Sequence, residues 1–137
     1  MSKSFEQLQL GESASFTKTI TETDVVLFGG LSGDLNPAHF DEVSAQASQF
    51  KGRIAHGALV ASLISSVLGM KLPGEGTIYL KQESNFVKPV YFGDTITATV
   101  TVIEKTEKKR VILQTDCKNQ NDELVITGHA TVLAPRK

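Results

Sequence analysis

The segment Ile54–Met70 constrains the fold most strongly, because it runs for 17 residues without a charged side chain. Its apolar side chains leave no polar stripe on a helix, and such a helix must be enclosed by other elements. A bilayer span needs about 20 predominantly apolar residues, whereas this segment is shorter and contains His56, three serines and two glycines. We therefore predict a helix that is buried in protein, ends at Lys71–Gly74, and has no membrane partner.

The chain after residue 76 predicts strands. Side chains alternate most clearly over Thr95–Glu104, where apolar residues occupy one face and threonines the other, as in a sheet with one buried face. The predicted strands are Glu12–Ile20, Thr77–Val87, Thr95–Glu104, Arg110–Lys118 and Glu123–Leu133. Short turns join most of them, which indicates antiparallel pairing. An antiparallel sheet wrapped around the central apolar helix, an α+β architecture, would bury both the helix and one sheet face.

Residues 21–50 predict two short helices between the first strand and the apolar segment. Thr21, with an acidic residue three positions later, is typical of a helix start, and the helical pattern ends at Ser32-Gly33-Asp34. Asn36-Pro37 extends that loop, because proline disfavours the helical conformation in the residue before it. Asp41–Phe50 then predicts a short polar helix.

Size, charge and cysteine content exclude several classes of protein. The 137 residues correspond to one domain, 1–137, that can bury a core without metal ions or disulfides. A net charge of −1 excludes the strongly basic footprint of a nucleic-acid-binding protein. One cysteine cannot form an internal disulfide, and the first eleven residues contain no apolar run typical of a secretory signal. We therefore expect a cytoplasmic location.

The densest cluster of polar residues lies between Ser32 and Asp41 and contains the first candidate chemical groups. Asp34 and His39 are five residues apart across a proline turn, a spacing that allows a carboxylate and an imidazole to converge on one point. Such a pair can take a proton from a water molecule and return a proton to a substrate carbon. The alternative is that Asp34 caps a turn and that His39 packs at the surface of the loop.

A second candidate site begins the apolar segment. Unpaired N–H groups at the start of a helix provide positive potential, which stabilises a carbonyl oxygen as negative charge develops on it. Gly57 would allow a ligand to approach that backbone closely. The alternative is that Gly57 only eases the packing of the helix against a strand.

These two sites together carry a resemblance to a known family. The pattern Gly33-Asp34-x-Asn36-Pro37-x-His39-x-Asp41, followed by Ile54-Ala55-His56-Gly57 and the apolar helix, resembles the MaoC-like (R)-specific enoyl-CoA hydratases of the hot-dog fold. The resemblance continues through Phe86-x-x-Pro89-Val90-x-x-Gly93-Asp94 and therefore covers nearly the whole chain.

The resemblance implies an enzyme that adds water reversibly to a trans-2-enoyl-CoA and forms the (3R)-hydroxyacyl-CoA. It implies that Asp34 and His39 hold and activate the water, that the Gly57 N–H polarises the thioester carbonyl, and that Ser65 and Asn36 have supporting roles. It also implies a homodimer with the substrate tunnel at the subunit interface, coenzyme A as part of the substrate, and no metal or redox cofactor.

Two other functions compete with hydration. A hot-dog acyl-CoA thioesterase commonly has a carboxylate on its central helix, and Gly57–Met70 contains no Asp or Glu. A non-catalytic acyl-thioester sensor would usually need an output domain, for which 137 residues leave no room.

Several further polar residues have simpler interpretations. We expect His56 to orient the start of the helix, His129 to be structural or exposed, and Cys117 to be a small core residue. The three histidines and the cysteine are scattered along the sequence and show no metal-site spacing. Candidate contacts for the coenzyme A phosphates are Arg53, Lys81, Lys88, Lys105, Lys108, Lys109 and Arg110.

Overall fold

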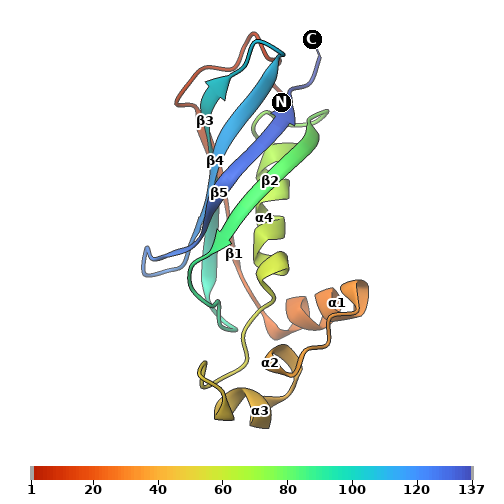
Figure 1. The fold of residues 1–137 in the computed structure, drawn as a ribbon, viewed down its shortest axis with the longest axis vertical. Coiled ribbons are helices and arrows are strands. Elements are labelled where there is room, and N and C mark those ends of the chain that lie inside the picture. Colours follow the sequence, from red (N-terminus) through yellow and green to blue (C-terminus); the bar gives the residue numbers. More distant parts are fainter. Residues whose placement is uncertain (1, 137) are drawn as a thin grey trace.

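The computed structural model describes residues 2–136 and has a single antiparallel sheet with the order β1-β3-β4-β5-β2 (Figure 1). In chain order the elements are β1 (Ser13–Thr19), α1 (Glu22–Ser32), α2 (Pro37–Phe40), α3 (Glu42–Ala47), α4 (Gly57–Met70), β2 (Ile78–Phe86), β3 (Thr95–Lys105), β4 (Arg110–Lys118) and β5 (Leu124–Leu133). All five predicted strands are present, each within two residues of its predicted bounds. The alternation of apolar and polar residues sets these bounds, because a strand with one buried face repeats every two residues.

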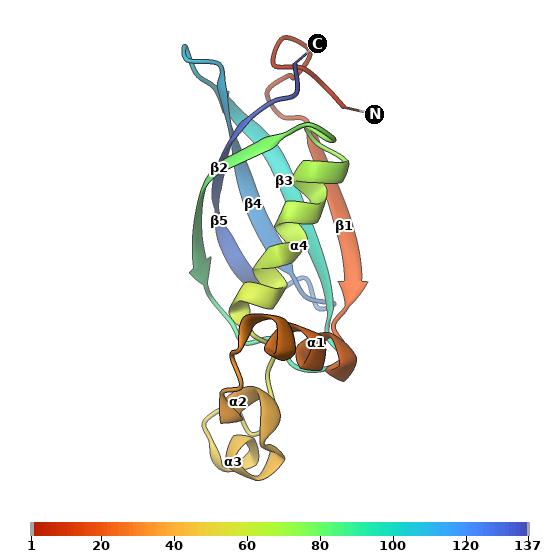
Figure 2. The same ribbon diagram turned by 90° about the vertical axis from the view of Figure 1, so that its right-hand side faces the viewer.

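The sheet curves around α4, which lies lengthwise against its inner face (Figure 2). On β3 the inward residues Ile96, Ala98, Val100 and Val102 are buried, and the intervening threonines are only partly covered. Cys117 on β4 also lies in this core, as predicted. The sheet and the helix therefore bury one continuous apolar interior between them.

The central helix is covered on one face only, which corrects the prediction that it is enclosed on all sides. Five residues face the sheet and are buried, namely Val60, Leu63, Ile64, Val67 and Leu68. Ala58, Ser62 and Ser65 are exposed on the opposite face. Small residues such as alanine and serine occur on buried and on exposed helix faces alike, so the sequence alone did not reveal which face of the helix is open. Across residues 2–136, no helix has the length and apolarity to span a membrane.

The helices α1, α2 and α3 lie beyond the end of the sheet that holds the start of α4 (Figures 1 and 2). Thr21 begins α1 with a reciprocal capping box to Asp24, and Gly33 ends it in the left-handed conformation that favours glycine. The predicted loop at 37–40 is instead the one-turn helix α2, in which Asn36 caps the N-terminus and Pro37 occupies the first turn. The same proline that excludes Asn36 from a helix is well suited to begin one.

Two predicted helix boundaries were too wide. The polar helix α3 ends at Ala47 rather than at Phe50. The apolar helix begins at Gly57 rather than at Ile54, because Ile54 forms a β-bridge with Tyr91 and the Ala55 N–H donates to the Val90 carbonyl. The extended segment 54–56 therefore leads from the α1–α3 region into the central helix. Its Ile54 carbonyl and its His56 side chain take part in the site described below.

Candidate active site

The loop 34–39 and the segment before α4 meet at the lower end of the sheet in Figure 1. The Ile54 N–H donates to the Ala38 carbonyl over 3.1 Å, and the Arg53 Nε–H donates to the His39 carbonyl over 2.7 Å. These bonds place polar side-chain atoms of Asp34, His39 and His56 within 4.8 Å of one another. The structure thus brings together the two predicted acid–base residues and adds a third group.

His39 is held in one tautomer by the backbone. It is 8% exposed, and its Nδ1 lies 2.6 Å from the Ile54 carbonyl oxygen. A carbonyl oxygen only accepts, so Nδ1 carries the hydrogen in the neutral ring, and the lone pair is on Nε2. The ring can therefore accept a proton at Nε2 while the backbone fixes its orientation.

Asp34 presents a carboxylate at the surface of the site. Its Oδ1 accepts a hydrogen bond from the Asn36 N–H over 3.2 Å, and its own N–H donates to Ser32 Oγ over 3.1 Å. The Asn36 side chain accepts in turn from the Ala38 N–H as the cap of α2. Asn36 thus shapes the loop that carries both Asp34 and His39, which is a supporting position.

His56 is the site residue whose part the sequence analysis underestimated. Its ring stacks on the ring of His39, with centroids 3.9 Å apart and planes inclined by 30°. Its Nε2–H donates to the Asp34 backbone carbonyl over 2.9 Å, and the side chain forms no cap for α4. The only sequence signal was its place next to Gly57, because 22 residues separate it from Asp34 in the chain.

The same three residues correct the argument that the histidines are too scattered to share a metal ion, since sequence spacing did not reveal this cluster. Each of the two rings already uses one nitrogen to bond a backbone carbonyl, so only one nitrogen of each histidine is left to contact another group.

Gly57 is the first residue of α4, so its N–H has no acceptor inside the helix. No acceptor for it is found elsewhere in the described chain, 2–136. A Cβ at this position would lie 2.8 Å from two ring atoms of Phe86. A larger residue here would have to displace the Phe86 ring, and the glycine leaves a backbone donor free.

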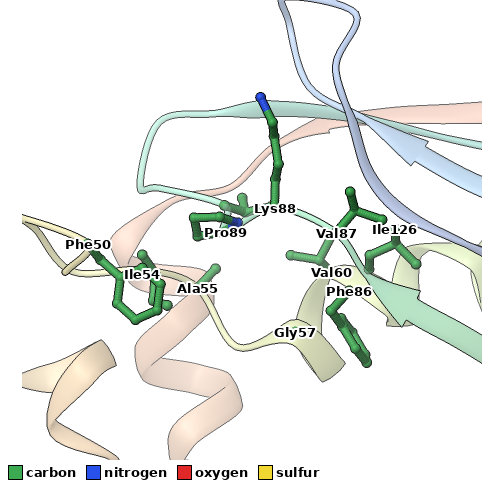
Figure 3. A pocket seen from close by; sticks show the side chains of 11 residues that line it. Phe50, Ile54, Ala55, Gly57, Val60, Phe86, Val87, Lys88, Pro89 and Ile126 are labelled. Atoms are coloured by element: carbon green, nitrogen blue, oxygen red, sulfur yellow. The ribbon is translucent and has the colours of Figure 1, made fainter.

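A pocket of about 420 Å³ opens beside Gly57 (Figure 3). It lies between the start of α4 and the segment after β2, and its lining is largely apolar: Phe50, Ile54, Ala55, Gly57, Val60, Phe86, Val87, Lys88, Pro89, Val90 and Ile126. Asp34 and His39 do not line it. Ile54 joins the two parts, because its side chain lines the pocket and its carbonyl holds His39.

Ser65 is not brought to this site within the chain. It lies two turns of α4 beyond Gly57, about 12 Å along the helix axis. Its side chain is exposed. The supporting role implied for Ser65 therefore stays a prediction.

One of the predicted phosphate contacts lies at the pocket. Lys88 lines it, and in Figure 3 its ammonium group points away from the apolar walls. Lys88 also bonds Glu123, and this hydrogen bond, the largest cause, lowers the pKa of the Glu123 carboxyl. Arg53 is engaged by Glu22 and the His39 carbonyl. The basic residues of the β3–β4 turn lie at the other end of the sheet in Figure 1.

An antiparallel sheet curved around one long helix, with a carboxylate and an imidazole beside an apolar pocket, defines a hot-dog protein with an acid–base site. The MaoC like domain model matches residues 6–123. The (R)-specific enoyl-CoA hydratase of Rhodospirillum rubrum is 52% identical over 134 residues, which cover 97% of this chain and 92% of that protein. The 3-hydroxybutyryl-CoA dehydratase of Methylorubrum extorquens is 42% identical and matches 97% of this chain and 85% of its own length.

Solved structures agree with these sequence matches. The unliganded R-hydratase PhaJ1 from Pseudomonas aeruginosa superposes with a TM-score of 0.93 at 42% identity, covering 98% of this chain and 86% of that one. The chain belongs to the MaoC-like family. The predicted family and the predicted hot-dog fold are thereby confirmed.

Proposed function

We infer that this protein is an (R)-specific enoyl-CoA hydratase, a hydro-lyase that adds water reversibly to trans-2-enoyl-CoA and forms (3R)-hydroxyacyl-CoA. One observation supports the assignment of the site: the imidazole of His39, with its lone pair on Nε2, lies beside the Asp34 carboxylate and is held by the carbonyl of Ile54, a residue that lines the apolar pocket beside the free Gly57 N–H. Acid–base groups, an oxyanion donor and an acyl pocket are the parts that hydration requires.

The reaction follows from these parts. The thioester carbonyl accepts a hydrogen bond from the Gly57 N–H, and Asp34 and His39 hold a water molecule next to the β-carbon. His39 Nε2 takes a proton from the water as its oxygen bonds the β-carbon, and the π electrons move onto the carbonyl oxygen as an enolate. The proton then passes to the α-carbon as the carbonyl reforms. Water and proton reach the same face of the alkene, which makes the addition syn.

The chemistry balances with water as the only co-reactant. Hydration transfers no electrons to or from the protein, and the positive end of α4 supplies the polarisation that a Lewis acid would otherwise provide. We therefore propose that the enzyme uses no metal or redox cofactor, and that coenzyme A enters as part of the substrate. We also propose a cytoplasmic location.

We propose that the enzyme is a homodimer. β2 is an edge strand of the sheet and exposes Ile78, Tyr79 and Leu80, which makes it a template for pairing with another strand. The face of α4 that carries Ser62 and Ser65 is also exposed. A two-fold pairing of β2 with β2 of a second copy would cover an apolar edge on both chains at once. Sedimentation equilibrium is expected to give twice the monomer mass, and a monomer at micromolar concentration would contradict the proposal.

Thioester hydrolysis is the competing activity. The residues of α4 include no carboxylate that could drive it.

The decisive assay follows the ultraviolet absorbance of a short trans-2-enoyl-CoA, with free thiol monitored in parallel and the product separated on a chiral column. Loss of absorbance without thiol release, with a (3R) product, is the expected result. Thiol release at a comparable rate would replace the hydratase with a thioesterase, and a (3S) product would overturn the stereochemical assignment.

A further inference from the structure

The imidazole of His56 takes no part in the steps proposed above, yet it lies in the middle of the site. It is 2% exposed, and its Nδ1 is one of two buried side-chain polar atoms without a hydrogen-bond partner within residues 2–136. Buried polar atoms are paired in the large majority of cases. An unpaired ring nitrogen beside acid–base residues therefore points to a use for the ring that outweighs the lost hydrogen bond.

His56 contacts each of the groups assigned to the chemistry. Its Nε2–H donates to the Asp34 carbonyl over 2.9 Å, and its ring lies 3.9 Å from the ring of His39. It is also the residue before Gly57, at the N-cap of α4. One side chain thus connects the carboxylate loop, the imidazole and the oxyanion donor, which come from segments far apart in the sequence.

We propose that His56 is a positioning residue, whose hydrogen bond to the Asp34 backbone and whose stacking on His39 set the distance between the two groups that handle the water. The proposal rests on the proposed hydratase function. His56 itself does not touch the substrate, because its side chain is 2% exposed and its Nδ1 is shielded from solvent. Its effect reaches the reaction only through Asp34 and His39.

Aromatic side chains surround the His56 ring and help to fix its position. Phe28 and Phe40 pack around it, with ring centroids at 4.9 Å and 5.9 Å. Because a carbonyl oxygen only accepts, Nε2 carries a hydrogen, which it donates to the Asp34 carbonyl.

The two contacts can be removed separately. His56→Phe keeps a stacked ring and loses the donor, whereas His56→Gln keeps an N–H at similar reach and loses the stacked ring. His56→Ala removes both. A displacement of about 1 Å at a reacting group can cost a factor of about 100. We expect kcat to fall by about that factor in His56→Ala with an unchanged KM, and by less in each partial variant. His129→Gln, at an exposed position on β5, is the matched control and should retain wild-type kinetics.

The partial variants also guard against a simple folding defect. If His56→Ala fails to fold, His56→Gln and His56→Phe decide, and values of kcat within twofold of wild type in both would overturn the proposal. If kcat falls only in variants that also lose thermal stability, and KM rises in the same variants, the role of His56 is purely structural. That result would also overturn the proposal.

A second measurement does not depend on turnover. Long-range 1H–15N spectra at neutral pH report which ring nitrogen carries the hydrogen, and we expect Nε2 in His56 and Nδ1 in His39. The opposite tautomer of His56 would refute the positioning contact. If the tautomers are as expected and the wild-type protein does not hydrate enoyl-CoA, then the contact stands and the proposed function fails, so the two failures are distinguishable.

Discussion

Gly57→Ala tests whether the start of α4 binds the thioester carbonyl. The new Cβ would lie 2.8 Å from Cδ1 and Cε1 of Phe86. Carbon atoms in contact prefer a separation of about 3.5–4.0 Å, so the ring must move by roughly 1 Å. Phe86 is 59% exposed, which lets the ring move toward solvent while the helix backbone stays in place.

The stability change is small, because two effects oppose each other. Crowding a packed position costs about 1–3 kcal/mol, and replacing glycine by alanine returns about 0.4–1 kcal/mol through the unfolded chain. The unfolding free energy should therefore fall by about 2.6 kcal/mol at most. Activity should fall much further, by about 100-fold in kcat/KM, since the added methyl group occupies the space beside the N–H that the carbonyl must approach.

Two further variants separate crowding of Phe86 from obstruction of the carbonyl. Gly69→Ala is the matched control on the same helix, because no atom lies within 4 Å of its new Cβ, and it should be neutral in activity and slightly more stable. The double variant Gly57→Ala/Phe86→Leu should recover stability and remain slow. Urea unfolding and the enoyl-CoA absorbance assay measure both quantities. Turnover of Gly57→Ala within twofold of wild type would refute the oxyanion assignment.

Three further changes test other parts of the reasoning. Asp34→Asn should lower kcat by about 10²–10⁴-fold with an unchanged far-ultraviolet circular dichroism spectrum, because an amide oxygen can still accept from the Asn36 N–H; near-full turnover would defeat the acid–base role. Lys88→Ala should raise KM for enoyl-CoA by about 2- to 5-fold and leave KM for an enoyl-pantetheine unchanged, and equal changes for both substrates would exclude a phosphate contact. Burial raises the pKa of the Cys117 thiol from 9.0 to about 12. As the pH rises, the unfolded chain therefore loses its thiol proton before the folded chain does. Above about pH 9, the free energy of unfolding of the wild type should fall by about 1.4 kcal/mol per pH unit more than that of Cys117→Ala. Urea titrations that give parallel pH profiles for the two proteins would contradict the burial of this thiol.

The sheet was predictable because each strand carries its own period-two signal. Thr95–Glu104 was predicted and Thr95–Lys105 is observed, with a register irregularity between Val102 and Glu104 at the point where the alternation ends. Packing in this sheet depends on which face each side chain occupies, and that is a property of local sequence.

The convergence of the acid–base pair was predictable because its two residues are neighbours in sequence. Asp34 and His39 lie on one loop, and their spacing across Pro37 already suggested convergence. His56 reaches them from another segment, so its bond to the Asp34 carbonyl depends on tertiary packing. A pattern read along the chain assigns His56 to the helix start, because it contains no information about which loop that helix start will meet.

The placement of the base also bears on the choice between hydration and hydrolysis. Hydrolysis needs the attacking water at the carbonyl carbon, which is bonded to the oxygen that Gly57 would bind. Hydration needs the water at the β-carbon, two bonds farther along the acyl chain. His39 is held by the Ile54 carbonyl, outside the residues that line the pocket beside Gly57, and α4 offers no second carboxylate near the carbonyl. Because α4 has no carboxylate that could direct a water molecule at the carbonyl carbon, the chain lacks the group that hydrolysis on this fold would use, and this favours attack on the alkene.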